Sequence, residues 1–216
     1  MPARPLLLGH RGARATRSIP ENTFESFDRA LADGCDGFEF DVRLSADRQA
    51  VVFHDDEVGR QAIAETPAAS LANLPTLAGV LRRYQQTAFL DIELKVPGLE
   101  RIALKLVEHF PPRLGFVLSS FLRDPLRQLR QMDACVPLGL ICEHRKQLAG
   151  WRDESVQYLI AHQRLMSEKL VREVAEEEKA LLVWTVNRPE QMRRFANWGV
   201  SGIISDQTLL LAKTFK

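Results

Sequence analysis

Cysteine is scarce in this sequence, which contains only three among 216 residues. Three cysteines can form at most one intramolecular disulfide, so the sequence is not that of a disulfide-stapled secreted scaffold. Cys35, Cys135 and Cys142 are widely spaced and lie mostly among apolar residues. We therefore expect them to be reduced and structural, in a protein of a reducing compartment.

Long hydrophobic runs are missing as well. Near the N-terminus only three consecutive leucines, Leu6, Leu7 and Leu8, precede the first polar residues, and a secretory signal needs a longer apolar region. No other stretch approaches the ~20 apolar residues of a membrane span. These absences predict a soluble cytoplasmic protein with no stable membrane anchor.

The sequence has no excess of charge of either sign. Its 29 basic and 28 acidic residues give a formal net charge of +1. We expect no broad attraction to nucleic acid or to an anionic membrane, so any anion that the protein binds must be held by local groups. The composition leaves the oligomeric state open.

Several common catalytic motifs are absent. The chain has no GxGxxG motif or P-loop, no Gly-x-Ser-x-Gly elbow and no zinc-spaced cluster of Cys and His. These absences argue against dinucleotide, nucleotide and serine-hydrolase chemistry.

The sequence does contain a regular alternation of short apolar runs with amphipathic segments. We expect strands at residues 6–9, 37–44, 50–53, 88–95, 114–119, 138–142, 158–162, 181–186 and 202–205. We expect helices at residues 22–31, 77–84, 99–109, 125–132, 168–179, 189–198 and 209–215. Strands separated by helices are typical of parallel βαβ units. With 45% hydrophobic residues the chain can bury a sizeable core, and we expect one domain over residues 1–216.

Eight of the nine strands fit a closed (β/α)₈ TIM barrel. Strand 50–53 follows its predecessor too closely for a crossover helix, so we assign it to a short hairpin extension at the barrel mouth. The first helix is expected to begin with Asn22 as N-cap and Glu25 in a capping box, and to end before Gly34. Region 143–156 should hold one helix, but its hydrophobic pattern is weak.

The strand at 37–44 alternates charged with apolar residues. Because strand side chains point to alternate faces, Glu39, Asp41 and Arg43 share one face, and apolar side chains share the other. One interpretation is a solvated edge strand. On the inner face of a barrel, by contrast, acidic groups would be costly without a partner.

A second predicted strand repeats this pattern with Asp91, Glu93 and Lys95. Barrel strands converge at the C-terminal mouth, so Glu39, Asp41 and Glu93 could meet there. At ~5 Å two such charges repel by roughly 3 kcal/mol at an effective dielectric of 20. A hard divalent cation would remove this repulsion, and all-oxygen ligands suit Mg²⁺ or Ca²⁺. The alternative is ion pairing with Arg43 and Lys95 and no metal.

The five histidines differ in their predicted positions. His10 and His54 each follow a strand and are expected at the barrel mouth, where TIM-barrel active sites lie. Beside converging carboxylates, this pair indicates catalysis rather than a structural role. His109 at a helix end is explained by capping, and His144 by surface exposure. His162 could contact substrate or pack structurally.

Further candidates for substrate binding also lie at strand ends. Arg11 is a candidate phosphate clamp, because guanidinium geometry matches phosphate oxygens. Lys95 could supply a second positive charge. Phe121 and Trp184 could form an apolar wall for a substrate, or could be ordinary core.

The ordered set of motifs resembles the glycerophosphodiester phosphodiesterase family, and the resemblance covers almost the whole chain. The motifs are His10-Arg11-Gly12, Pro20-Glu21-Asn22-Thr23, Glu39-Phe40-Asp41-Val42, Asp47 followed by His54-Asp55, Glu93-Leu94-Lys95, Ser119 with Phe121, Trp184-Thr185-Val186-Asn187, and Gly199 through Asp206. Each motif alone is weak, but the ordered set is specific.

This resemblance implies a TIM barrel that hydrolyses glycerophosphodiesters to sn-glycerol 3-phosphate and an alcohol, with one divalent cation, Mg²⁺ or Ca²⁺. It also implies roles for individual residues. The metal-binding positions are Glu39, Asp41 and Glu93, the acid and base are His10 and His54, and Arg11 and Lys95 face the phosphate with Glu21 close by.

We expect metal-assisted phosphoryl transfer with His10 as the base and His54 as the acid, although the sequence does not settle that order. By resemblance to phospholipase-C-like barrels, the nucleophile would be the glycerol 2-hydroxyl. An alternative is a lysophospholipase D or another phosphodiesterase of the same superfamily. A non-catalytic phosphate-binding barrel is disfavoured, because it would be expected to have lost a histidine or a carboxylate.

One segment departs from the family pattern. Relatives usually carry a longer insertion after the second histidine, often with threonines after an arginine. Here about twenty residues separate His54 from Pro75, and Arg60 is present without the threonines. We therefore expect a reduced cap insertion and weak discrimination between leaving alcohols.

Overall fold

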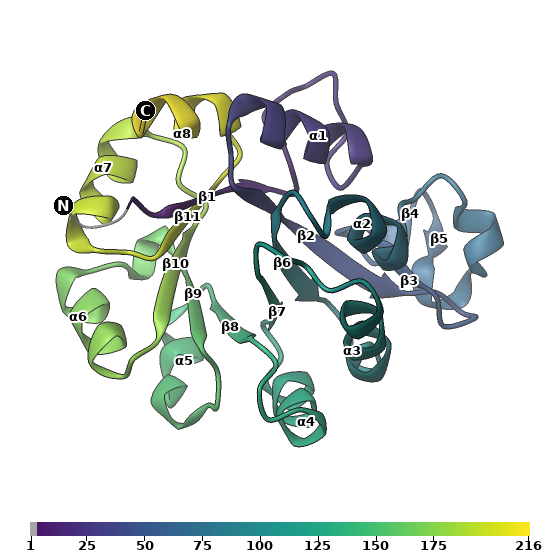
Figure 1. Ribbon diagram of the computed structural model, residues 1–216. Helices are drawn as coiled ribbons and strands as arrows, with labels where there is room; N and C mark the ends of the chain where they lie inside the picture. Colours follow the sequence, from purple (N-terminus) through teal and green to yellow (C-terminus); the bar gives the residue numbers. More distant parts are fainter. Residues whose placement is uncertain (1–3) are drawn as a thin grey trace.

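The computed structural model describes residues 4–216 and contains the expected barrel (Figure 1). Eight parallel strands form it: β1 (Leu6–His10), β2 (Gly37–Leu44), β6 (Phe89–Leu94), β7 (Phe116–Ser120), β8 (Leu138–Cys142), β9 (Tyr158–His162), β10 (Ala180–Trp184) and β11 (Gly202–Ser205). Strand β1 pairs with both β2 and β11, so the sheet closes. Residues 1–3, where the N-terminal stretch considered for a secretory signal begins, lie outside the described residues.

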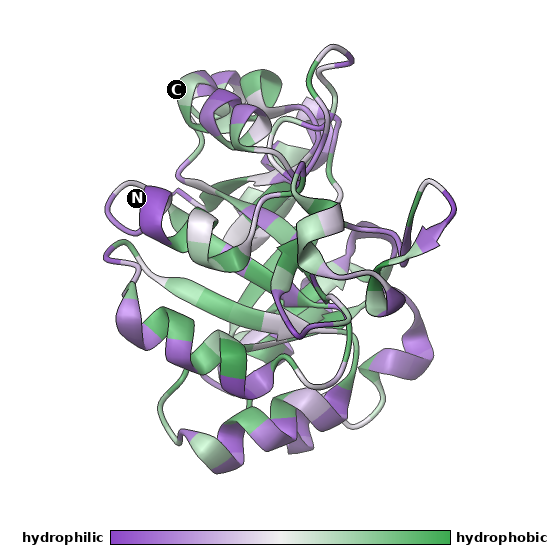
Figure 2. Cartoon of the chain, turned by 90° about the vertical axis from the view of Figure 1, so that its right-hand side faces the viewer, coloured by the Kyte–Doolittle hydropathy of each residue, from purple (hydrophilic) through white to green (hydrophobic). Residues whose placement is uncertain are grey.

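A helix follows each barrel strand before the next one begins. The helices are α1 (Phe24–Asp33), α2 (Leu77–Tyr84), α3 (Glu100–His109), α4 (Arg123–Met132), α5 (Arg145–Leu148), α6 (Glu168–Glu176), α7 (Pro189–Trp198) and α8 (Thr208–Thr214). They surround the strands, and each longer helix carries both hydrophobic and hydrophilic residues (Figure 2). This two-sided composition suits a layer with one face on the barrel and one in water.

The alternation in β2 divides buried apolar from buried acidic side chains as expected. Phe38 and Phe40 face the helices, and the Phe38 ring stacks on Phe27 of α1 with centroids 4.2 Å apart. Glu39 and Asp41 therefore point into the barrel. The barrel floor beneath them is filled by a separate apolar cluster: Leu8, Phe89, Val117, Ile141, Ile160, Leu182 and Ile204.

The hairpin extension is present and small. Strand β3 (Ala50–Val52) pairs antiparallel with the end of β2. After it come β4 (Glu57–Val58), β5 (Gln61–Ala62) and the short helices η1 (Ile63–Glu65) and η2 (Ala68–Leu71), which lie to one side of the barrel in Figure 1. A three-residue cluster of Val51, Ile63 and Leu71 holds this segment together. The segment thus forms a low structure beside the mouth.

The start of the first helix differs from the expectation. Thr23, not Asn22, is the N-cap, and the capping box is completed by Ser26, not Glu25. Asn22 has a positive φ of 58° and uses its side chain on the barrel, where Nδ2 donates to Asp41. Gly34 ends the helix in the left-handed conformation, as expected.

The weakly patterned region 143–156 forms only α5 and the short helix η3 (Trp151–Asp153). Arg123 of α4 holds this region in place. Its guanidinium donates to the backbone oxygens of Gln147 and Ala149 and to the buried carboxylate of Glu154. Side-chain contacts from a neighbouring helix thus replace the missing amphipathic pattern.

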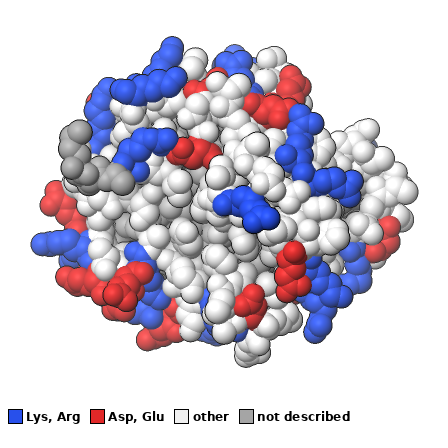
Figure 3. All heavy atoms as spheres, in the orientation of Figure 1, with Lys and Arg blue, Asp and Glu red and all other residues white. Residues whose placement is uncertain are grey.

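The cysteines and the surface agree with the composition. Cys35 and Cys142 are buried and Cys135 is exposed, and none is in a disulfide. On the face shown in Figure 3, basic and acidic side chains are interspersed around the edge without a large area of one sign. No helix within residues 4–216 combines the length and apolarity required to cross a membrane.

Candidate active site

A cavity of about 390 Å³ opens at the C-terminal mouth of the barrel. Most of the predicted site residues line it, together with three buried isoleucines and two further acidic residues. The lining residues are His10, Arg11, Glu39, His54, Asp91, Glu93, Lys95, Phe121, Ile141, Glu143, Ile160, Trp184 and Ile204. Two predicted residues, Asp41 and Glu21, lie behind this lining and contact Arg11. The structure therefore brings together all ten residues singled out from the sequence.

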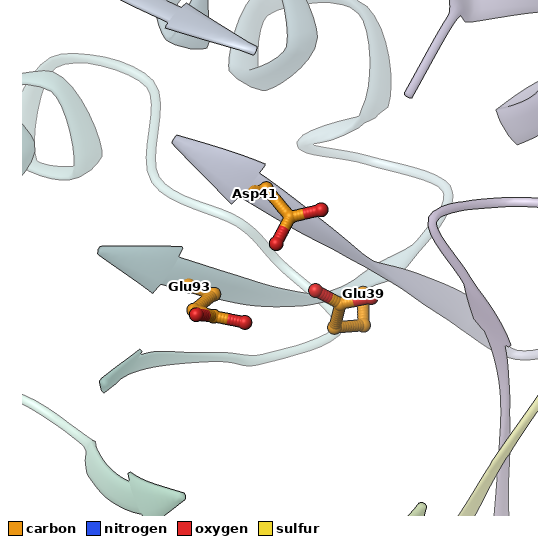
Figure 4. A group of neighbouring side chains, drawn as sticks. All are labelled: Glu39, Asp41 and Glu93. Carbon is orange, nitrogen blue, oxygen red and sulfur yellow. The ribbon is translucent and has the colours of Figure 1, made fainter. Parts of the chain in front are cut away.

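Three carboxylates meet on one wall of the cavity (Figure 4). The parallel register of β2 and β6 places Asp41 directly beside Glu93, and Glu39 lies two residues earlier on the same face of β2. One oxygen from each of the three lies within 4.8 Å of the others. All three side chains are buried, so water does little to screen their mutual repulsion.

The repulsion and the burial appear in the pKa values of this wall. Burial raises the pKa of Glu39 well above its usual range, and the charges of Asp41 and Glu93 raise it further. Burial, followed by the charge of Asp41, raises the pKa of Glu93 to about 7. Burial alone would also raise the pKa of Asp41, but Lys95 and Arg11 lower it. The neighbouring cations Lys95 and Arg11 therefore do not fully compensate the three carboxylates.

A hard divalent cation fits this donor set. The three residues offer only carboxylate oxygens, which are the ligands that Mg²⁺ and Ca²⁺ prefer. Asp41 Oδ1 is buried and has no hydrogen-bond donor, although Lys95 Nζ forms an ion pair with it at 3.2 Å. An additional positive charge would compensate this oxygen and lower the raised pKa values of Glu39 and Glu93.

Two fixed cations flank the carboxylate wall. Lys95 Nζ lies 2.9 Å from Glu93 Oε1. Arg11 has a positive φ of 54°, its backbone N–H donates to Glu39 at 3.0 Å, and its guanidinium donates to Glu21 at 2.7 Å. Both side chains are mostly buried yet line the cavity. Arg43, the other cation expected to pair with the carboxylates, instead donates to the backbone oxygen of His54.

His10 is held by a carboxylate that the sequence analysis did not single out. Its Nδ1 lies 2.7 Å from Asp206 Oδ1, and its Nε2 lies 3.9 Å from Glu39 Oε2 in the cavity. Asn187 donates to Asp206 Oδ2 at 2.7 Å. Burial would raise the pKa of Asp206, but the hydrogen bond and charge of His10, the Asn187 amide and Arg14 lower it to about 2. Asp206 therefore stays ionised and orients the His10 ring.

His54 has a similar but more exposed arrangement. Its Nδ1 lies 2.6 Å from Asp55 Oδ1, which leaves Nε2 available to the cavity. Burial lowers the pKa of His54, and the cations Arg11 and Lys95 also lower it. A protonated His54 would thus release its proton more readily than a free imidazole.

Two aromatic side chains line another part of the cavity, and Lys95 Nζ lies 6.0 Å from the ring centroid of one of them, Phe121. Phe121 and Trp184 meet edge to face with centroids 5.7 Å apart. His162 does not line the cavity but packs against Trp184, with centroids 5.1 Å apart. His109 lies in the last turn of α3, and His144 is exposed beside α5.

Several residues of the site were missed by the sequence analysis. Asp206 directly follows β11, just as His10 ends β1. Its position at a strand end could therefore have identified it as a candidate site residue. Asp91 was predicted to share the polar face of Glu93 but was given no role; it lies on the inner face of β6, and Ser119 Oγ donates to it at 2.5 Å. Burial raises the pKa of Asp91 to about 7. The contact from Asn22 to Asp41 had no sequence signal, because it depends on the tertiary fold.

Comparisons with known proteins agree with this geometry. The profile of the "Glycerophosphoryl diester phosphodiesterase family" matches residues 10–105 and 74–210. The glycerophosphodiester phosphodiesterase of Caldanaerobacter subterraneus subsp. tengcongensis is 29% identical over 233 residues, which cover 94% of each chain. The glycerophosphodiester phosphodiesterase of Bacillus subtilis is 25% identical over 262 residues, which cover 100% of this chain and 88% of the relative.

Solved structures share the fold. A glycerophosphodiester phosphodiesterase from Thermotoga maritima superposes with a TM-score of 0.85 at 24% identity and covers 98% of both chains. An Oleispira antarctica phosphodiesterase in complex with the product sn-glycerol-3-phosphate also has a TM-score of 0.85 at 24% identity, covering 98% of this chain and 96% of its own. Their likeness extends over the whole barrel.

Proposed function

Because this chain belongs to the glycerophosphoryl diester phosphodiesterase family, we propose that it hydrolyses glycerophosphodiesters to sn-glycerol 3-phosphate and an alcohol. The observation that carries the proposal is one cavity at the barrel mouth, lined by two fixed cations, two histidines, Glu39 and Glu93, with Asp41 directly behind these two carboxylates. The relative from Caldanaerobacter and the product-bound structure from Oleispira support the same substrate class.

Glu39, Asp41 and Glu93 would hold one divalent cation, Mg²⁺ or Ca²⁺. When bound, such a cation neutralises phosphate oxygens and increases the electrophilicity of phosphorus. Arg11 and Lys95 would contact the same phosphate from the cavity wall. Their existing ion pairs with Asp41, Glu21 and Glu93 hold them in place before the substrate arrives.

The two histidines would divide the proton transfers. His10 Nε2 takes the proton of the glycerol 2-hydroxyl, whose oxygen then forms a bond to phosphorus. The bond between phosphorus and the alcohol oxygen breaks, and that oxygen receives a proton from His54. Water then opens the cyclic phosphate to sn-glycerol 3-phosphate. Asp206 favours His10 as the base because it stabilises the imidazolium, and the lowered pKa of His54 favours it as the acid.

The low segment after His54 supports weak discrimination between alcohols. Residues 57–71 form only two short strands and two short 3₁₀ helices beside the mouth, so few groups reach over the cavity. The loss of one well-placed polar contact weakens discrimination between alcohols by roughly 1–3 kcal/mol.

The three unpaired cysteines further support a reducing compartment such as the cytoplasm.

The proposal is tested by coupled detection of glycerol 3-phosphate. The purified chain is incubated with glycerophosphodiesters and with lysophospholipids, with Mg²⁺, with Ca²⁺ and with EDTA. We expect glycerol 3-phosphate from the diesters with a divalent cation, and none with EDTA or with His10→Ala. Turnover of lysophospholipids alone would overturn the proposed substrate class, and full turnover in EDTA would overturn the metal site.

A further inference from the structure

Glu143 lines the cavity apart from the three carboxylates, at the end of a strand that β7 separates from β6. It directly follows β8, where Ile141 faces the barrel interior and Cys142 faces the helices, so strand alternation turns Glu143 inward. Strand β8 lies across the barrel from β1, because β2, β6 and β7 separate them on one side and β9, β10 and β11 on the other. Glu143 therefore faces the cavity from the side opposite His10.

The charge of Glu143 is not used by the catalytic groups. Within residues 4–216, its one ion-pair partner is His144, at 3.8 Å, and both side chains are well exposed. Such a pair is weak and easily displaced. The two cations that line the cavity, Arg11 and Lys95, pair instead with carboxylates of β2 and β6. Glu143 thus adds a negative charge that no strong partner in this part of the chain compensates.

Aromatic groups flank this carboxylate. Strands β7 and β9 lie on either side of β8 and carry Phe121 and His162 at the mouth. Both rings meet Trp184 edge to face, at interplanar angles of 79° and 83°. Burial and nearby Arg164 lower the pKa of His162, although the charge of Glu143 acts in the opposite direction. A carboxylate beside aromatic faces is suited to an organic cation.

We propose that Glu143, together with Trp184 and Phe121, forms a subsite that favours glycerophosphodiesters with a cationic alcohol, such as choline or ethanolamine. This inference rests on the proposed function. A phosphodiester held at the carboxylate wall must extend its substituents across the cavity, toward β7, β8 and β10. An ammonium group there is attracted by the carboxylate of Glu143 and by the faces of the aromatic rings.

The experiment compares kcat/KM for glycerophosphocholine, glycerophosphoethanolamine and uncharged-alcohol glycerophosphoglycerol. For Glu143→Gln we expect a fall of roughly five- to tenfold for the two cationic substrates, the size typical of a partly exposed charge contact with an aromatic face. Glycerophosphoglycerol should change by less than about twofold, and Glu143→Lys should enlarge the difference. The matched control is Glu108→Gln, which makes the same charge change on an exposed residue near the C-terminal end of α3.

A second measurement separates recognition from a structural role. Tetramethylammonium should inhibit hydrolysis of glycerophosphoglycerol by the wild type, and should inhibit Glu143→Gln more weakly. Equal losses for all three substrates, or an unchanged ratio between them, would overturn the subsite while the wild-type hydrolysis stands. If the wild type hydrolyses none of the three diesters, the proposed function itself fails, and the subsite fails with it.

Discussion

Replacement of Asp206 by Asn tests how His10 is activated. Asp206 accepts on both oxygens, from His10 on Oδ1 and from the Asn187 amide on Oδ2. In D206N one of these oxygens becomes an NH₂ group, which can only donate. If the new amide keeps its oxygen toward His10, its NH₂ group faces the NH₂ group of Asn187, and neither group can accept a hydrogen bond. If the amide flips, its NH₂ meets His10 Nδ1 and forces the proton onto Nε2, where the base should be free.

The structure sets the size of the two expected effects. The fall of the Asp206 pKa from 3.8 to about 2 corresponds to about 2 kcal/mol of folding stability. Because the folded-state pKa is depressed, this contribution is present above pH 3.8 and is lost as the pH falls toward 2. Activity should fall by about 10²- to 10⁴-fold, the range for general-base catalysis by an imidazole with the wrong tautomer.

The assay is glycerol 3-phosphate release, measured together with urea unfolding at pH 7. A matched double variant exchanges the two side chains. In D206N with Asn187→Asp, the carboxylate at position 187 accepts from the new amide, and the amide oxygen can again face His10. We expect this variant to recover part of kcat. Wild-type kcat in D206N would refute the orienting role of Asp206, and a double variant no better than the single one would refute the tautomer argument.

Four further outcomes are expected. Glu39→Gln should abolish turnover and the Mg²⁺-induced rise in Tm, yet stabilise the EDTA-treated protein, because it removes a buried repelling charge; an unchanged Mg²⁺ effect would contradict the metal site. In EDTA, stability should fall as pH rises from about 4.5 to about 7 and level off above that, because the pKa of Glu93 is raised to about 7, so the Tm gain from Mg²⁺ should be larger at pH 8 than at pH 6. His10→Ala and His54→Ala should each lower kcat/KM by orders of magnitude, and the double variant should lose little more. The wild type should show a bell-shaped pH profile of kcat/KM. A near wild-type rate in either single variant would exclude the replaced histidine from catalysis. Head groups should differ by less than about a hundredfold in kcat/KM, and a preference of several thousandfold would show that another loop closes the mouth.

The barrel was predictable because its signals are local and repeated. The alternation of apolar and acidic residues in β2 and β6 depends only on strand geometry, and it correctly separated Phe38 from Glu39. Convergence of strand ends then placed the carboxylates and both histidines together. The clustering of these side chains could therefore be predicted from the sequence alone.

The residues that orient the site were harder to predict because their contacts are long-range. Asn22 looked like a helix cap, yet its side chain contacts Asp41 on β2 and Thr23 caps the helix. Local capping preferences do not report such a tertiary contact. Glu143 directly follows the correctly predicted strand β8, but it opens a region whose hydrophobic pattern is weak, and nothing there singled it out.

The bond between His10 and Asp206 joins residues 196 positions apart, one at the end of the first barrel strand and one directly after the last. During synthesis the imidazole emerges from the ribosome long before the carboxylate that orients it. Contacts of such high sequence separation tend to form late and slowly. Turnover should therefore appear only when the final strand has docked, so the onset of activity in a refolding experiment reports ring closure, and a partly folded chain should not cleave substrate.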